Sequence, residues 1–529
     1  MAVPVEARRC LLQIDTLKTV SLEEYVSKGA AHNSHERGID APKCHPETRK
    51  AVQENILSHI GCGEERVLWL SGPAGAGKTA IMGSIAEECH ARGWLAGSFF
   101  ISASSMRSDR CSKRYLVPTL ASHLLELNIP NLPAAILTSI AANPSVFDKR
   151  LDHQTEILIL APIREVCKTA DLSKWPKVVL VDGVDECAAD EAREYKTKHE
   201  RQESKEANHR EVLSSLVELT NDPSFPFRIV IASRPEHAIE GYFSSLPFGV
   251  VTQVFLDDKY SPEDDITLYA QAMLTKIGRD SGLLGQWYSQ VGKALEIEDV
   301  PRHLAQQASG QFIYIATVIR YIQDKSGAPH KQLEHVLNWQ PSNRSNPFAV
   351  LDTLYLGILQ TSPNPARLGY KVFLESFPGE MEYLLSPLVS LVCIVGKNGE
   401  PDFHFYHKSL SDFLKDPQRC GAFHIPEHGI AEHINDRYIE VFKNKGPQGL
   451  TPHEEVLDRT LQDFCINLSH ILDLPHKKQY DASHVDWWLS HLPPRQAEDA
   501  ARRAFVNVHQ NRQRGVFPTP FLQIPVLAL

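Results

Sequence analysis

The feature that most constrains this chain is a glycine-rich loop between an apolar run and an apolar, helix-patterned segment. Residues 72–79 read Gly-Pro-Ala-Gly-Ala-Gly-Lys-Thr and match the pattern G-x-x-x-x-G-K-[ST] in full. Residues 67–70 are apolar and precede the loop, and residues 81, 85 and 89 follow it with helical spacing. This placement between a strand and a helix argues against a glycine turn that binds nothing.

The loop predicts a site for phosphate groups. Its glycines let successive backbone N–H groups turn toward an anion, and the helix that follows presents its positive end to the same anion. We expect the Lys78 ammonium to contact the β- and γ-phosphates of a nucleotide, and the Thr79 hydroxyl to ligate Mg²⁺. The residues expected to contact the nucleotide are Gly72, Pro73, Ala74, Gly75, Ala76, Gly77, Lys78, Thr79 and Ala80.

Short apolar runs of strand length recur along the first half of the chain. They alternate with helix-patterned segments, which predicts a parallel sheet with helices on both faces. Such an architecture is common among nucleotide-handling proteins, although a fold alone assigns no function. The runs are residues 67–70, 97–101, 178–181, 228–232 and 250–255.

A second acidic element follows one of these runs. Asp182 comes directly after four apolar residues, and we expect it to serve Mg²⁺ directly or through its second coordination shell. Asp185 or Glu186 could then polarise a water for in-line attack on the γ-phosphate. Alone, these acids could equally be surface carboxylates. Their pairing with the glycine-rich loop favours the catalytic interpretation.

A third run ends in Ser-Arg-Pro at residues 233–235. The planar guanidinium of Arg234 suits contact with a bound or transferred γ-phosphate. The alternative is an ion pair with a purely structural role.

Together these residues resemble the NACHT family of signal-transducing P-loop NTPases, which belongs to the STAND class. The similarity is greatest to the NACHT proteins abundant in fungi, and it spans about residues 45–420. Further matching segments are Ser98–Ile101, Ala308–Ile322, Leu351–Tyr355 and His407–Leu414.

The resemblance implies an α/β P-loop NTPase core, with a parallel sheet and helices on both faces, followed by helical and winged-helix-like domains. It also implies that His407 touches a bound diphosphate and holds a closed state, whereas a packed core histidine is the alternative. Thr48 and Arg49 match a segment that lies near the nucleotide base in relatives. The domains expected are a leader (1–45), the NTPase domain (46–258, with a charged insertion at 187–211), a helical domain (259–345), a winged-helix-like domain (346–425) and a C-terminal helical region with an apolar tail (426–529).

Composition narrows the choice of partner and compartment. Lys and Arg number 55 against 65 Asp and Glu, and this net charge of −10 argues against a dedicated nucleic-acid binder. No secretory signal and no apolar stretch long enough to span a membrane is evident. The ten cysteines show no C-x-x-C pair, so we expect a cytoplasmic protein. The charged insertion is expected to be a solvated loop or exposed helix, with a docking surface as the alternative.

The function expected is a slow, regulatory, Mg²⁺-dependent switch that binds and hydrolyses ATP or GTP. The resemblance places it in signalling, of the innate-immunity or self/non-self recognition type. A nucleotide-dependent homo-oligomer and an unidentified protein partner are also expected, although no effector segment or repeat array is recognised. The alternatives are a metabolic P-loop kinase, for which no acceptor signature is visible, and a nucleotide-binding scaffold without turnover.

Overall fold

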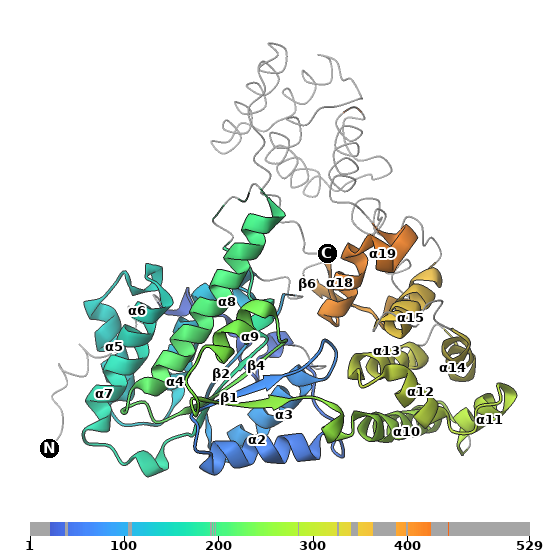
Figure 1. The fold of residues 1–529 in the computed structure, drawn as a ribbon, viewed down its shortest axis with the longest axis horizontal. Coiled ribbons are helices and arrows are strands. Elements are labelled where there is room, and N and C mark those ends of the chain that lie inside the picture. Colours follow the sequence, from blue (N-terminus) through green and yellow to red (C-terminus); the bar gives the residue numbers. More distant parts are fainter. Residues whose placement is uncertain are drawn as a thin grey trace. The chain divides into compact units, whose positions relative to one another are not determined.

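The computed structural model in Figure 1 describes most of the first four fifths of the chain. The predicted region 426–529 therefore lies outside the described residues, apart from Lys443. The described residues are 22–37, 41–103, 108–190, 193, 195, 197–283, 285–324, 327–339, 348–362, 388–397, 400–424 and 443.

The centre of the fold is a five-stranded sheet in which every pair of neighbours is parallel. Its strand order is β2-β3-β4-β1-β5. All five predicted strands are confirmed. Four of them are buried along nearly their whole length, as apolar runs in a parallel sheet predict, whereas the edge strand β5 is partly exposed. Their bounds are β1 Val67–Ser71, β2 Leu95–Phe100, β3 Val178–Asp182, β4 Arg228–Ser233 and β5 Val251–Phe255.

Helices cover both faces of this sheet (Figure 1). Successive side chains of a strand point to opposite faces, so Trp69 joins one buried cluster while Leu68 and Leu70 join another. The second cluster is completed by α2 Lys50–Cys62 and α3 Lys78–Ala91. The helices that contribute to the first cluster are α4 Leu116–Glu126, α5 Leu132–Ala142, α6 Leu151–Thr155, α7 Ala161–Cys167, α8 Lys198–Asn221 and α9 His237–Ser244.

Beyond residue 260 the sequence pattern is predominantly helical, and the described residues confirm this with one correction. The apolar spacing over residues 300–322 predicts a single helix, but the structure has two, because Ser309 and Gly310 adopt positive φ angles of 47° and 76° and end the first helix. A hairpin and a further helix follow. The elements are α10 Pro262–Asp280, α11 Trp287–Ala294, α12 Val300–Ala308, α13 Phe312–Gln323, α14 Pro329–Asn338, α15 Ala349–Gln360, β6 Val392–Lys397, β7 Glu400–Phe405 and α18 Lys408–Lys415.

The chain divides into two compact units. The first comprises residues 1–357 and 389–409, and the second comprises 358–388 and 410–529. The first unit holds the sheet, α10–α14 and the β6–β7 hairpin. In the second unit, Phe413 and Cys420 are buried, and the Asp416 side chain caps the short helix α19 (Pro417–Cys420) by accepting from the Gln418 N–H. No helix among the described residues is both long and apolar enough to cross a membrane.

The segment before α2 packs onto the sheet and α3. We call its described residues, 22–37 and 41–49, the leader segment. Leu22 is buried, the His32 N–H donates to the Ser98 hydroxyl (3.0 Å), and the Cys44 N–H donates to the Ser84 hydroxyl on α3 (3.0 Å). These contacts fix one end of the leader segment against β2 and the other against α3.

The second half of the charged insertion forms the beginning of α8, where the Thr197 hydroxyl accepts from the Glu200 N–H at the helix start. Most described positions of this stretch are exposed or half-buried, as expected, but Asn208 and His209 are buried. The sequence pattern did not reveal these two because isolated buried polar residues leave no periodic apolar signal.

Gly83 on α3 provides a test of how the leader segment is held. A Cβ at Gly83 would lie 2.7 Å from the Pro42 carbonyl oxygen, a backbone atom that yields only if the leader segment moves. We therefore expect Gly83→Ala to lower the melting temperature and to speed proteolysis within residues 41–49, although alanine favours helix over glycine.

The matched control is Gly241→Ala on α9, where a Cβ would meet nothing within 4 Å. That change should be neutral or stabilise the protein by up to about 1 kcal/mol. Equal melting temperatures and equal proteolysis for the two variants would contradict the described packing of the leader segment.

Candidate functional site

The glycine-rich loop leaves the end of β1 and enters α3, as its sequence predicts. Gly75 and Gly77 have φ angles of +77° and +91°, which non-glycine residues rarely adopt. Among the described residues, no backbone carbonyl accepts from the N–H groups of these two glycines. The loop thus offers free donors next to the positive end of α3, as an anion site requires.

Lys78 lies across this loop at the first position of α3. Its Nζ atom donates to the carbonyl oxygens of Gly72 and Pro73, both at 2.8 Å. Burial lowers the pKa of Lys78 to about 8, and the charges of Asp185 and Asp182 act in the opposite direction. A phosphate would add negative charge beside this ammonium and favour its protonated form.

Asp182 lies at the end of β3, beside the loop and the end of β4. It pairs in register with Ala232, and its side chain is 2% exposed. Burial raises the pKa of Asp182 to about 7, although a hydrogen bond from Thr79 and the charge of Arg37 lower it. Thr79 and Asp182 together offer the hydroxyl and carboxylate oxygens that Mg²⁺ prefers beside a phosphate. Elsewhere in the described part, no group of three or more His, Cys, Asp or Glu side chains is arranged to hold a metal.

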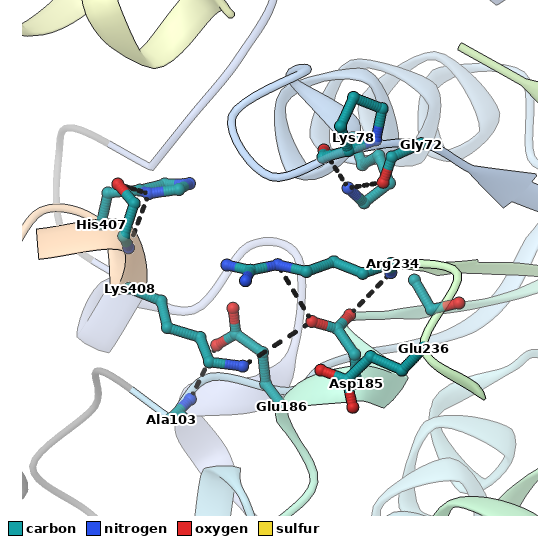
Figure 2. Close-up of polar contacts among 12 residues, drawn as sticks. Gly72, Lys78, Ala103, Asp185, Glu186, Arg234, Glu236, His407 and Lys408 are labelled. Carbon is teal, nitrogen blue, oxygen red and sulfur yellow. Dashed lines mark hydrogen bonds and ion pairs between the residues drawn. The ribbon is translucent and has the colours of Figure 1, made fainter. Parts of the chain in front are cut away.

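Asp185 is the centre of the charged network drawn in Figure 2. It accepts from the backbone N–H of Arg234 (3.0 Å) and forms ion pairs with the Arg234 Nε (3.4 Å) and the Lys408 Nζ (3.7 Å). Burial opposes ionisation, but the charges of Lys408 and Arg234 outweigh it and hold the pKa of Asp185 below its ordinary value. Asp185 is therefore an ionised carboxylate held by two cations.

Glu186 is the neighbouring carboxyl group, and its environment is different. Its Oε2 atom accepts from the backbone N–H of Ala103 (2.9 Å). Burial, followed by the negative charge of Asp185, raises the pKa of Glu186 above its ordinary value. The two adjacent acids thus have pKa values shifted in opposite directions, an arrangement that can separate acid and base roles.

His407 follows the β6–β7 hairpin, and Figure 2 shows its ring on the side of the network that faces the Lys78 loop. Its Nδ1 atom accepts from the backbone N–H of Ser409 (3.0 Å), so Nε2 carries the ring proton. Burial, followed by the charges of Arg234 and Lys78, lowers the pKa of His407 to about 3. A neutral imidazole that donates from Nε2 is therefore the species at physiological pH.

All these groups border one cavity of about 600 Å³. From the predicted set, the residues that line it are Gly75, Gly77, Lys78, Thr79, Ala80, Asp182, Asp185, Glu186, Arg234 and His407. The other predicted loop residues, Gly72, Pro73, Ala74 and Ala76, do not line it.

The cavity has further walls that sequence reasoning did not identify. They come from the leader segment (residues 41–45, beside Thr48 and Arg49), α10, α13 and the hairpin region. On α13 the lining positions recur with each helical turn, at 312 and 313, 316, 319 and 320, and 323, a spacing visible in the sequence but indistinguishable there from core packing. The residues from these helices and the hairpin are Tyr269, Met273, Phe312, Ile313, Ala316, Ile319, Arg320, Gln323, Asp324, Val389 and Tyr406.

Arg49 contacts the glycine-rich loop, α10 and α13, which form three walls of the cavity. Its Nη2 donates to the Ala76 carbonyl of the glycine-rich loop (3.0 Å), and its backbone N–H donates to the Asp265 carboxylate on α10 (3.1 Å). The guanidinium also lies 4.6 Å from the ring centroid of Phe312 at the start of α13. Its φ of +57°, unusual for arginine, is the conformation that allows backbone and side chain to reach these partners at once.

The order of strands, the glycine-rich loop and the acids at the strand ends define an α/β P-loop NTPase core followed by helical segments. Residues 53–234 match the family described as nephrocystin 3, N-terminal. This range runs from α2 to Arg234. It includes the glycine-rich loop, the acids of the Asp182–Glu186 segment and Arg234.

The chain was also compared with curated proteins and with solved structures. No curated protein matches it. Among solved structures, a chain from the structure of Drosophila ORC bound to DNA is similar at 15% identity, with a TM-score of 0.29, and the match covers 71% of this chain and 94% of that chain.

The contact between the glycine-rich loop and α13 yields a prediction. A Cβ at Gly75 would overlap the Ile313 Cγ2 atom, whereas a Cβ at Gly77 would meet Phe312 only at an ordinary 3.9 Å. Both glycines have positive φ, so alanine strains the backbone at either position by about 1–3 kcal/mol. We expect Gly75→Ala to destabilise the protein more than Gly77→Ala does.

Ile313→Ala should recover part of the loss caused by Gly75→Ala and none of the loss caused by Gly77→Ala. Melting temperatures of the single and double variants measure this coupling. Additive losses in both pairs would show that the loop and α13 do not touch at Gly75.

Proposed function

We propose that the chain is a nucleotide-controlled switch that binds ATP or GTP with Mg²⁺ and hydrolyses it slowly. The observation that carries this proposal is the shared cavity: the glycine-rich loop and the acidic strand ends form one wall, and α10, α13 and His407 form the others. A nucleotide bound there would contact the glycine-rich loop and the acidic strand ends as well as α10, α13 and His407. Its phosphates could therefore bias the position of these helices.

Each residue has a role that its chemistry supports. Lys78 and the loop N–H groups would hold the β- and γ-phosphates, and Thr79 and Asp182 would hold Mg²⁺, which supplies charge neutralisation for the developing leaving group. Arg234 would contact the γ-phosphate. Asp185 or Glu186 would orient the attacking water.

Lys408 would hold the protein in a resting state with low hydrolysis. Its ammonium neutralises Asp185, so this carboxylate is a poor base while Lys408 remains in place. His407, the residue before it, would donate from Nε2 to a phosphate oxygen. Moving a population from 1:99 to 99:1 needs about 5.5 kcal/mol of differential binding, and two or three charge-assisted hydrogen bonds of about 1.5–3 kcal/mol each would supply it.

Membership of the fungal NACHT group of STAND proteins is part of the same proposal. It is supported by the loop, the Asp182–Glu186 segment, Ser233–Pro235 and the His407–Leu414 segment taken together. The role in signalling, the homo-oligomer and the protein partner stay predictions of that resemblance. The cytoplasmic location stays a prediction from composition.

Two alternatives use the same loop. A metabolic kinase needs an acceptor pocket, and phosphate release without an added acceptor would argue against it. A scaffold binds nucleotide without turnover. The opposed pKa shifts of Asp185 and Glu186 favour turnover, because a scaffold gains nothing from such a pair.

Lys78 provides the test of binding. Lys78→Ala removes the one ammonium beside the loop carbonyls, and we expect it to abolish the binding of fluorescently labelled ADP and GDP. Lys259→Ala, which alters a 57%-exposed lysine remote from the cavity lining, is the control and should bind as the unmodified protein does. Micromolar affinity retained by Lys78→Ala would refute the nucleotide assignment.

Turnover is tested separately at the acids. Glu186→Gln keeps the shape of the side chain but cannot accept a proton as a carboxylate, so phosphate release should fall by about 100-fold. Lys408→Met frees Asp185 from one cation and should instead raise basal phosphate release several-fold. Both rates come from phosphate-release assays with ATP and GTP.

Unmodified protein that binds nucleotide and releases no phosphate is a scaffold. Turnover that is unchanged in Glu186→Gln would mean that Glu186 does not act as the base. Turnover that is unchanged in Lys408→Met would mean that the Asp185 contact does not restrain hydrolysis.

A further inference from the structure

Arg320 lines the cavity from α13, and no part of the proposed function uses it so far. Its guanidinium lies 4.3 Å from the ring centroid of Tyr406, which also lines the cavity and directly precedes His407. This cation–π contact uses none of the N–H donors of the guanidinium.

Within the described residues, Arg320 has no such partner. None of the described carboxylates forms an ion pair with it, and its Nη1 atom is buried without a hydrogen bond. The other two cavity arginines each have an acidic neighbour. Arg234 pairs with Asp185. Arg49 donates to the Ala76 carbonyl and lies near Asp265, although its Nε and Nη1 atoms are also buried without a hydrogen bond.

A guanidinium keeps its positive charge in proteins, so the unmet hydrogen-bond donor of Arg320 needs an acceptor. A guanidinium nitrogen buried without an acceptor costs free energy, which an anion in the cavity would recover. The neighbourhood is already cationic. Arg234, Lys78, Arg320 and Lys408 all act on His407.

We propose that Arg320 binds a phosphate group of the nucleotide, so that α13 senses the phosphate chain directly. This inference rests on the proposed function and adds a residue from the helical half to the phosphate-binding set. A phosphate is favoured over the base because a planar guanidinium binds phosphate through paired hydrogen bonds. Its position beside Tyr406 and His407 also places it with the phosphate-side cations.

The role assigned to Arg320 distinguishes it from a residue that shapes the base pocket. A phosphate contact should matter more for a diphosphate than for a monophosphate of the same base. A base contact, or a general loss of packing, should weaken both to the same extent.

The test is isothermal titration of the full chain with ADP, GDP, AMP and GMP. Arg320→Met keeps an apolar stem in the wall of the cavity and removes the charge, so we expect it to weaken diphosphate binding at least tenfold and monophosphate binding much less. Arg320→Lys keeps the charge without the planar fork. Its diphosphate affinity should lie between those of the unmodified protein and Arg320→Met. Arg302→Met on α12, which changes a 66%-exposed side chain, is the matched control and should leave both affinities unchanged.

The outcomes separate this inference from the proposed function. If the unmodified protein binds none of the four nucleotides, both fail. If it binds ADP or GDP and Arg320→Met binds as tightly, or weakens diphosphate and monophosphate equally, the Arg320 inference alone fails. Should Arg320→Met not fold, a lysine variant with unchanged diphosphate affinity overturns the paired contact, and one with a selective loss supports it.

Discussion

Parallel pairing of β3, β4 and β1 is the constraint on which the rest of the molecule depends. Hydrogen-bonded parallel neighbours end at the same edge of a sheet, so the residues that follow each strand must meet there. The glycine-rich loop, Asp182 and Arg234 are far apart in the sequence. They come together because their strands pair, and no contact among their side chains is needed for this. The register of β3 and β4 then fixes Asp182 opposite Ala232.

Charge balance is the second organising factor of the site. Asp185 is buried and the adjacent Glu186 is half-buried. Asp185 pairs with Arg234 from the end of β4 and with Lys408 from the segment after the hairpin, whereas Glu186 accepts a hydrogen bond from the backbone N–H of Ala103. The difference in partners, rather than a difference in chemistry between the two acids, sets their pKa values apart.

The sequence predicted the parts of this structure whose signal is local. Four of the five strands were recognisable because they are buried on both faces, and the phosphate loop because its glycines and lysine lie within eight residues. The break at Ser309 was missed because an apolar helical pattern continues through it. Arg320 and Lys408 were missed for a different reason: each matters through a neighbour distant in the sequence, and one isolated basic residue carries no pattern.

The contacts of Arg49 have a mechanical consequence. Because this residue binds the phosphate loop through its side chain and α10 through its backbone, α10 cannot swing away from the sheet without disturbing the loop. The start of α13 is joined to the same loop by a backbone hydrogen bond from Ile313 to Gly75. By contrast, the segment 405–409 reaches the sheet through the side chain of Lys408. An incoming ligand that displaces the Lys408 side chain would therefore separate this segment from Asp185 while the contacts of the loop with Arg49 and α13 stay intact.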